Sequence, residues 1–124
     1  MKLLKKEIDY WIFDLDNTLY SADSGIFQQV HVLMGKFISK HLNKNPIEAK
    51  EIQNKYYKKH GTTLRGLMDN HDIDPDFFLE EVHKLDYSIV NPNQDLKESL
   101  QNLKGEKFIF TNANLQHANM ILEK

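Results

Sequence analysis

Two short runs of β-branched and aromatic residues, at positions 8–13 and 107–110, constrain the fold most strongly. Each run ends abruptly at polar residues, and this pattern is typical of a short buried strand. The residues between the two runs have mainly helical periodicity. Because strands that are separated by helices pair in parallel, the sequence predicts an α/β fold with a parallel pair formed by these two runs.

The connection between the strands is predicted to hold four helices in a block and then a fifth helix, and a last helix follows the second strand. Pro46 and Pro75 each follow a capping residue and mark two helix starts, and Gly61 marks a helix end. The four-helix block is predicted to be an insertion at the carboxyl end of the first strand, where open α/β sheets bind ligands. The apolar residues that define the six helices are, in order, Phe27, Val30, Met34, Phe37, Ile38 and Leu42; Ile52 and Tyr56; Leu64, Leu67 and Met68; Phe78, Val82 and Leu85; Leu96, Leu100 and Leu103; and Leu115, Ala118, Ile121 and Leu122.

Asp14 and Asp16 follow the first strand directly, in the run Asp-Leu-Asp-Asn-Thr at positions 14–18. Side chains two residues apart in an extended chain project to the same side. One such carboxylate can attack an electrophile while the other transfers protons. Two adjacent carboxylates also favour a divalent cation, and all-oxygen ligation suits Mg²⁺. The alternative is a polar turn at a strand end, for which Asp, Asn and Thr are ordinary residues.

The composition excludes several classes of protein. The chain has 124 residues, the length of one domain, with 16 Lys and Arg against 18 Asp and Glu. This balance argues against the strongly basic surface of a nucleic-acid-binding protein. The absence of cysteine excludes disulfides and a cysteine nucleophile and is compatible with the cytoplasm.

No targeting or membrane segment is predicted near the start of the chain. The basic residues there are followed by Glu7 and Asp9, and the next apolar run is far too short for a signal peptide or a membrane span. We therefore expect a cytoplasmic protein without a membrane or nucleic-acid polymer as partner. The six histidines lack metal-ligand spacing, and we expect surface or helix-face positions for them, at 31, 41, 60, 71, 83 and 117.

Two segments resemble motifs of the haloacid dehalogenase-like (HAD) hydrolases, most of which are Mg²⁺-dependent phosphatases. Residues 10–20 (Tyr-Trp-Ile-Phe-Asp-Leu-Asp-Asn-Thr-Leu-Tyr) resemble the first motif, and residues 108–112 (Phe-Ile-Phe-Thr-Asn) resemble the second. The resemblance implies a HAD-like Rossmannoid core in which Asp14 is the nucleophile that becomes an aspartyl-phosphate. It also implies that Asp16 is the general acid and base, and that both aspartates bind Mg²⁺, Asp16 through its main-chain carbonyl. Thr18 would hold the loop, and Thr111, supported by Asn112, would bind the phosphoryl group.

The same resemblance implies a domain division, with a helical cap at residues 21–86 inserted into a partial core made of residues 1–20 and 87–124. Residues 14–20, 56–67 and 111–113 are most similar to the pyrimidine 5′-nucleotidase-like branch of the family. This implies a nucleoside monophosphate as substrate, with phosphoglycolate or a sugar phosphate as alternatives. Candidate substrate contacts in the cap are Tyr57, Thr62, Thr63 and Arg65; the alternative is that they cap helices or face solvent.

The third and fourth motifs of the family, a basic residue and then one or two acidic residues, cannot be placed after Asn112. The resemblance therefore predicts a C-terminally truncated chain with little phosphatase activity until a complementing C-terminal fragment is supplied. Two alternatives stay open. The missing groups would come from another subunit of a homo-oligomer, or the chain is a non-catalytic binding module derived from the family.

Overall fold

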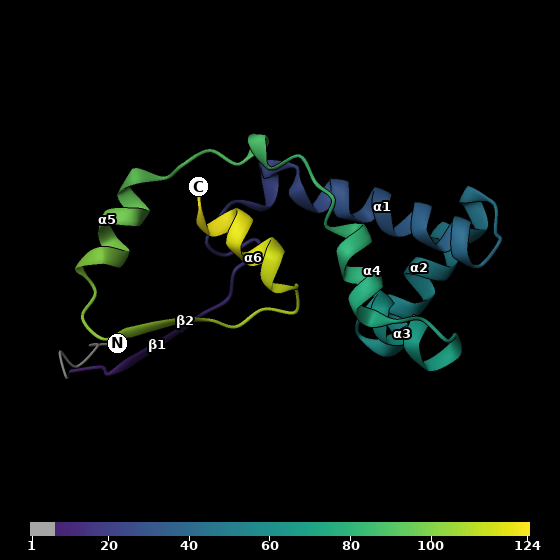
Figure 1. Cartoon of the computed structure of the whole chain (residues 1–124), viewed down its shortest axis with the longest axis horizontal. Helices are drawn as coiled ribbons and strands as arrows, with labels where there is room; N and C mark the ends of the chain where they lie inside the picture. The colour runs from purple at the N-terminus through teal and green to yellow at the C-terminus, as the bar shows by residue number, and fades with distance from the viewer. Residues whose placement is uncertain (1–6) are drawn as a thin grey trace. The chain divides into compact units, whose positions relative to one another are not determined.

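The computed structural model describes residues 7–124 and contains two compact units, which we treat separately (Figure 1). The sheet unit comprises the described residues up to Ser24 together with Ser88–Lys124, and the helical unit comprises Gly25–Tyr87. Residues 1–6, which belong to the predicted core range 1–20 and carry the basic start of the chain, lie outside the described residues. The elements in chain order are β1 (Tyr10–Phe13), η1 (Ala22–Ser24), α1 (Ile26–His41), α2 (Pro46–His60), α3 (Thr63–Asn70), α4 (Pro75–Val82), η2 (Tyr87–Ile89), α5 (Gln94–Asn102), β2 (Glu106–Ile109) and α6 (Leu115–Leu122).

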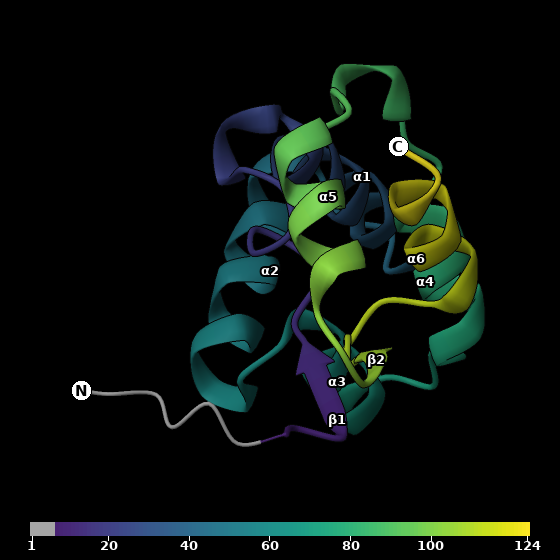
Figure 2. The same ribbon diagram turned by 90° about the vertical axis from the view of Figure 1, so that its left-hand side faces the viewer.

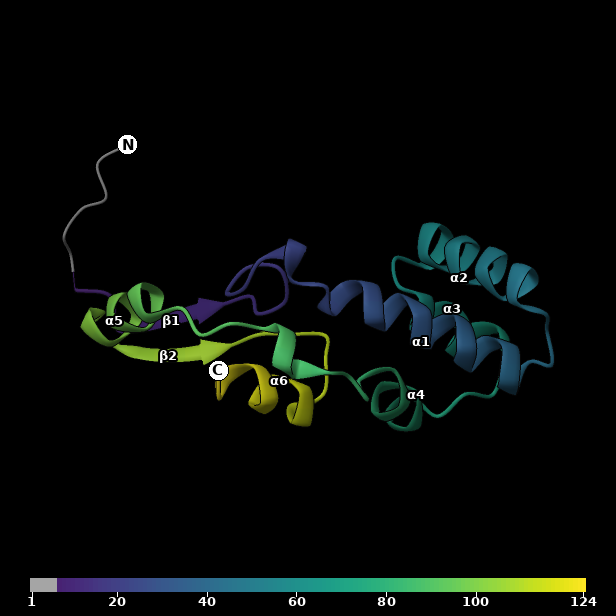
Figure 3. The same cartoon turned by 90° about the horizontal axis from the view of Figure 1, so that it is seen from above.

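The sheet unit is built on a two-stranded sheet in which β1 and β2 run side by side in the same direction (Figure 3). Tyr10 pairs with Glu106 and Phe13 with Ile109, so the predicted parallel pair is confirmed. The helices α5 and α6 belong to the same unit (Figure 2). The fold class is therefore α/β, with far more helix than strand.

The prediction that the first strand is buried is wrong. Ile12 is 72% exposed, and Phe110, which follows β2 directly, is 76% exposed. The ring centroids of the exposed residues Tyr10 and Phe108 lie 6.2 Å apart. Side chains alternate between the two faces of a strand, and a two-stranded sheet offers few neighbours to cover both faces. The sequence pattern identified the strands correctly but not their surroundings.

The helices of the helical unit begin and end at the residues that the capping signals in the sequence predict. The Asn45 side chain accepts a hydrogen bond from the Glu48 N–H at the start of α2 (2.9 Å), and Asp74 caps α4 in the same way through Asp76. Gly61, with φ of 88°, ends α2. These side-chain acceptors satisfy N–H groups that a helix leaves unpaired at its first turn. One helix is shorter than expected, because α4 ends at Val82, before Leu85.

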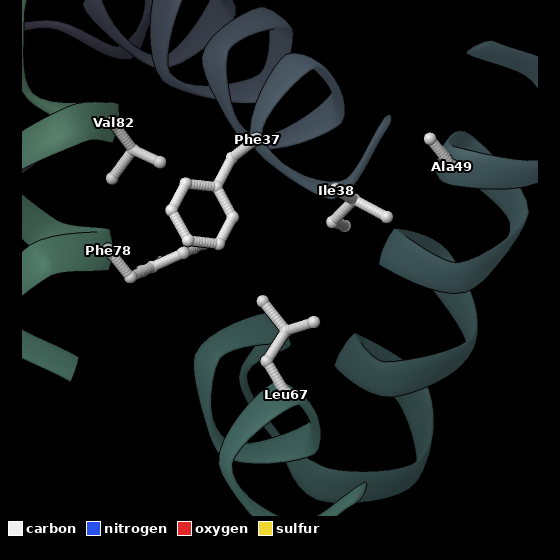
Figure 4. Close-up of a cluster of buried hydrophobic side chains, with 6 residues drawn as sticks. All are labelled: Phe37, Ile38, Ala49, Leu67, Phe78 and Val82. Carbon is white, nitrogen blue, oxygen red and sulfur yellow. The ribbon is translucent and has the colours of Figure 1, made fainter. Parts of the chain in front are cut away.

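One apolar cluster joins all four helices of the helical unit (Figure 4). The rings of Phe37 from α1 and Phe78 from α4 meet edge to face, with centroids 5.0 Å apart. Such a pair adds to the stabilisation that comes from burial alone. The buried members of the cluster are Phe37, Ile38, Ala49, Leu67, Phe78 and Val82.

Gly66 permits a close approach of α3 to α2. A Cβ atom at this position would lie 2.3 Å from Cβ of Tyr56, whereas one at Gly35 in α1 would meet only Gln53 Oε1 at 3.6 Å. We expect Gly66→Ala to lower the free energy of unfolding by about 1–3 kcal/mol, because an overpacked contact must be relieved. The matched variant Gly35→Ala should raise it by about 0.5–1 kcal/mol through helix propensity. Urea unfolding of the two variants tests this, and equal effects would contradict the packing.

Within residues 7–124, no helix combines the length and the apolar composition that crossing a bilayer requires.

Candidate active site

Both candidate motifs leave the sheet at the same edge. Phe13 is paired with Ile109, and the Phe110 N–H still donates to the Phe13 carbonyl at 2.9 Å. Asp14 follows Phe13 directly, and Thr111 follows Phe110. The structure therefore brings Asp14 and Thr111 to the carboxyl edge of one parallel pair, which is where open α/β sheets bind ligands.

The loop after β1 turns tightly around Leu15, whose side chain is fully buried. The N–H groups of Thr18 and Leu19 both donate to the Leu15 carbonyl, at 3.2 and 3.0 Å. Asn17 has a φ of 60°, a left-handed conformation that Asn tolerates better than most residues. The turn brings the Thr18 hydroxyl within 2.7 Å of Asp14 Oδ2, to which it donates. One oxygen of the exposed Asp14 carboxylate is thus held by its own loop.

Asp16 is held by two side chains on one oxygen. Its Oδ1 accepts a hydrogen bond from the Tyr20 hydroxyl at 2.5 Å and lies 2.7 Å from Nε2 of His117 in the first turn of α6. The side chain of Asp16 is 24% exposed and that of His117 is 1% exposed. A half-buried carboxylate and a buried imidazole thus meet directly beside the candidate nucleophile's loop.

His117 does lie on a helix face, in α6, but the expected surface position is wrong. Its ring is buried and lies against Asp16. The sequence does contain a signal for the burial of His117. His117 precedes Ala118 and lies one turn before Ile121, and these three residues form the buried face of α6. Leu115 and Leu122, two of the four apolar residues that define this helix in the sequence, are exposed.

Thr111 and Asn112 form the start of the turn between β2 and α6. The Thr111 hydroxyl oxygen accepts a hydrogen bond from the Ala113 N–H at 3.1 Å, and the side chain is half-buried. A hydroxyl group that accepts one bond still has a hydrogen to donate. Asn112 is exposed. The turn therefore fixes the Thr111 side chain, and the hydroxyl hydrogen can still be donated to an anionic ligand.

The oxygen atoms at this edge fit Mg²⁺ by chemical type, although residues 7–124 contain no group of three or more His, Cys, Asp or Glu side chains that could hold a metal ion. Mg²⁺ commonly takes only one or two carboxylates and completes its shell with water and phosphate oxygens. The Asp14 carboxylate and the Asp16 main-chain carbonyl are ligands of this kind. A fully protein-built cage is not present in this part of the chain.

The four candidate substrate residues of the helical unit divide into two pairs. Thr62 caps α3 by accepting from the Arg65 N–H at 3.1 Å. Thr63 is 5% exposed and donates to the Gln53 carbonyl at 3.1 Å, so the expected substrate contact by Thr63 is not supported. Tyr57 and Arg65 have exposed side chains, and Arg65 Nε lies 3.4 Å from Asp69 Oδ1. Thr62, Tyr57 and Arg65 are exposed and keep side-chain surface for a ligand, whereas the buried Thr63 does not.

The chain is similar to Phosphate metabolism protein 8 of Saccharomyces cerevisiae. The two sequences are 30% identical over 120 residues, a region that covers 87% of this chain and 37% of the yeast protein. The chain thus spans little more than a third of the length of this relative. No family model matches the chain.

Proposed function

We propose that the protein is a Mg²⁺-dependent phosphomonoester hydrolase of the HAD type that acts through an aspartyl-phosphate on Asp14. The observation that carries the proposal is the parallel pairing of Phe13 with Ile109, which brings Asp14 and Thr111 to one sheet edge. Asp16 lies two residues beyond Asp14 and is held by two hydrogen-bond partners. The similarity to a yeast protein named for phosphate metabolism supports a phosphatase-like role.

The chemistry assigns a separate task to each side chain. Thr18 holds Oδ2 of Asp14, and the other carboxylate oxygen attacks the phosphorus atom, while the bond from phosphorus to the ester oxygen breaks. Protonated Asp16 gives its proton to the departing alcohol oxygen. A water molecule then attacks the phosphorus atom of the aspartyl-phosphate and loses a proton to Asp16, which releases inorganic phosphate and restores Asp14.

Positioning and electrostatics supply most of the catalysis in such a phosphoryl transfer. Thr111 would donate its hydroxyl hydrogen to a phosphoryl oxygen, with Asn112 supporting the turn. The Asp14 carboxylate and the Asp16 main-chain carbonyl would hold Mg²⁺, which lowers the repulsion between a carboxylate and an approaching phosphate dianion.

We propose nucleoside monophosphates as the substrate class and the helical unit as the part that selects them. Tyr57 offers an exposed ring on which a base can stack, and the Arg65 guanidinium can pair with a phosphate. Phosphoglycolate and sugar phosphates carry the same ester group and are the alternative substrates. A cap that closes over a site also excludes water from the reaction.

Phosphate release from a panel of nucleoside monophosphates, phosphoglycolate and sugar phosphates tests the proposal. We expect release that falls to background when EDTA removes divalent cations and that returns when excess Mg²⁺ is added. Release that is indifferent to EDTA would contradict the Mg²⁺ dependence. The absence of release from every ester, both by the chain alone and with a complementing C-terminal fragment, would contradict the hydrolase itself.

A further inference from the structure

The contact between Asp16 and His117 joins the loop after β1 to the first turn of α6, across 101 positions of sequence. We propose that His117 is a positioning residue that orients the Asp16 carboxyl group for proton transfer to the leaving group. This inference rests on the proposed function, in which Asp16 is the general acid and base.

His117 must act as the donor in this contact when Asp16 is ionised. An ionised carboxylate only accepts hydrogen bonds, so the imidazole presents Nε2–H to Oδ1. The burial of His117 excludes water from the bond and strengthens it. The bond length of 2.7 Å is that of a short, charge-assisted hydrogen bond.

The position of His117 is itself fixed by the start of α6. Asn114 caps this helix and accepts a hydrogen bond from the His117 N–H at 2.8 Å. Ala118 and Ile121 on the same face are buried. The imidazole is therefore presented from a rigid element, which is the condition under which a donor can set the orientation of a partner group.

Two donors on a single oxygen restrict the rotation of the Asp16 carboxyl group. Tyr20 belongs to the same loop as Asp16, whereas His117 belongs to α6. Loss of His117 therefore removes a contact that links the Asp16 carboxyl group to another element of the unit. A general acid must lie within hydrogen-bond reach of the atom that it protonates. Misplacement of a reacting group by about 1 Å can cost about 100-fold in rate.

The experiment compares two esters that differ in their need for an acid. A nucleoside monophosphate expels an alkoxide, which requires a proton, whereas 4-nitrophenyl phosphate expels a stabilised phenolate, which does not. We expect His117→Asn, whose amide is too short to reach Asp16, to lower kcat for the nucleotide by about 10–100-fold. It should change kcat for the aryl ester little.

The matched variant is His117→Gln, which places an amide N–H donor at nearly the same reach as Nε2. We expect it to restore most of the ratio between the two substrates. A second control is Tyr56→Phe, which removes a hydroxyl–imidazole contact of 2.8 Å to His71 in the helical unit. It should leave the ratio between the two substrates unchanged. His117→Leu serves as the donor-free variant if His117→Asn does not fold.

The outcomes separate this inference from the proposed function. If folded His117→Asn or His117→Leu proteins lose both activities to the same extent, His117 only stabilises the fold, and the positioning role is overturned while the hydrolase stands. A ratio that His117→Gln does not restore would also overturn it. If the unsubstituted protein hydrolyses neither ester, the proposed function fails and the positioning role fails with it.

Discussion

Asp14→Asn is expected to lower the rate of phosphate release by at least about 10³-fold, because it removes the only group that we assign as nucleophile. The amide has nearly the same shape as the carboxylate, and its oxygen can still accept the 2.7 Å hydrogen bond from Thr18. The loop after β1 should therefore keep its conformation, and the loss should appear in kcat. The prediction is a ratio of initial rates under identical conditions, so it does not depend on the absolute rate.

The control for this substitution is Asp23→Asn. Asp23 is an exposed carboxylate of the same unit, in η1, and it contacts Ser21 through its main-chain N–H rather than through its carboxylate. Its substitution makes the same change in charge and should leave the rate unchanged. An Asp14→Asn protein that retains a rate close to that of the unsubstituted protein would contradict the role of Asp14.

Phe78→Ala is expected to lower the free energy of unfolding by about 3–5 kcal/mol. Phe78 is 1% exposed, packs edge to face on Phe37, and belongs to the cluster that joins the four helices. The substitution removes a whole ring from this cluster and leaves a cavity that rigid helices fill only in part. Domains of this size have a total stability of roughly 5–15 kcal/mol, so the expected loss is a large share.

Urea unfolding, followed by far-UV circular dichroism, measures this loss. Ile47→Ala in α2 is the matched control, because that side chain is 74% exposed and its removal should change stability by less than about 0.5 kcal/mol. Equal effects of the two substitutions would contradict the position of Phe78 in the core.

Most of the features that the sequence predicted correctly are local ones. Asn45, Gly61 and Asp74 mark helix ends because capping involves residues only a few positions apart. The parallel pairing of the two strands followed from the helices between them, and it explains why Asp14 and Thr111 leave the sheet at one edge.

The features that the sequence did not predict depend on contacts between distant segments. The spacing of α6 placed His117 on the buried face, but nothing local to His117 indicated Asp16 as its partner. The exposure of Ile12 depends on how many neighbouring elements cover the strand, and the strand pattern alone does not reveal that number. Thr63 is a candidate substrate contact by resemblance, yet its hydroxyl donates to the Gln53 carbonyl inside the helical unit.

The measurement that tests the central proposal most directly is a search for the phosphoryl group on Asp14. The protein is mixed with substrate and Mg²⁺, quenched in acid within the first turnover and digested, and the peptides are examined by mass spectrometry. We predict one added phosphoryl group on the peptide that contains Asp14, absent from Asp14→Asn and present in Asp23→Asn. Phosphate release without any phosphorylated Asp14, or a phosphoryl group on another residue, would contradict the aspartyl-phosphate mechanism.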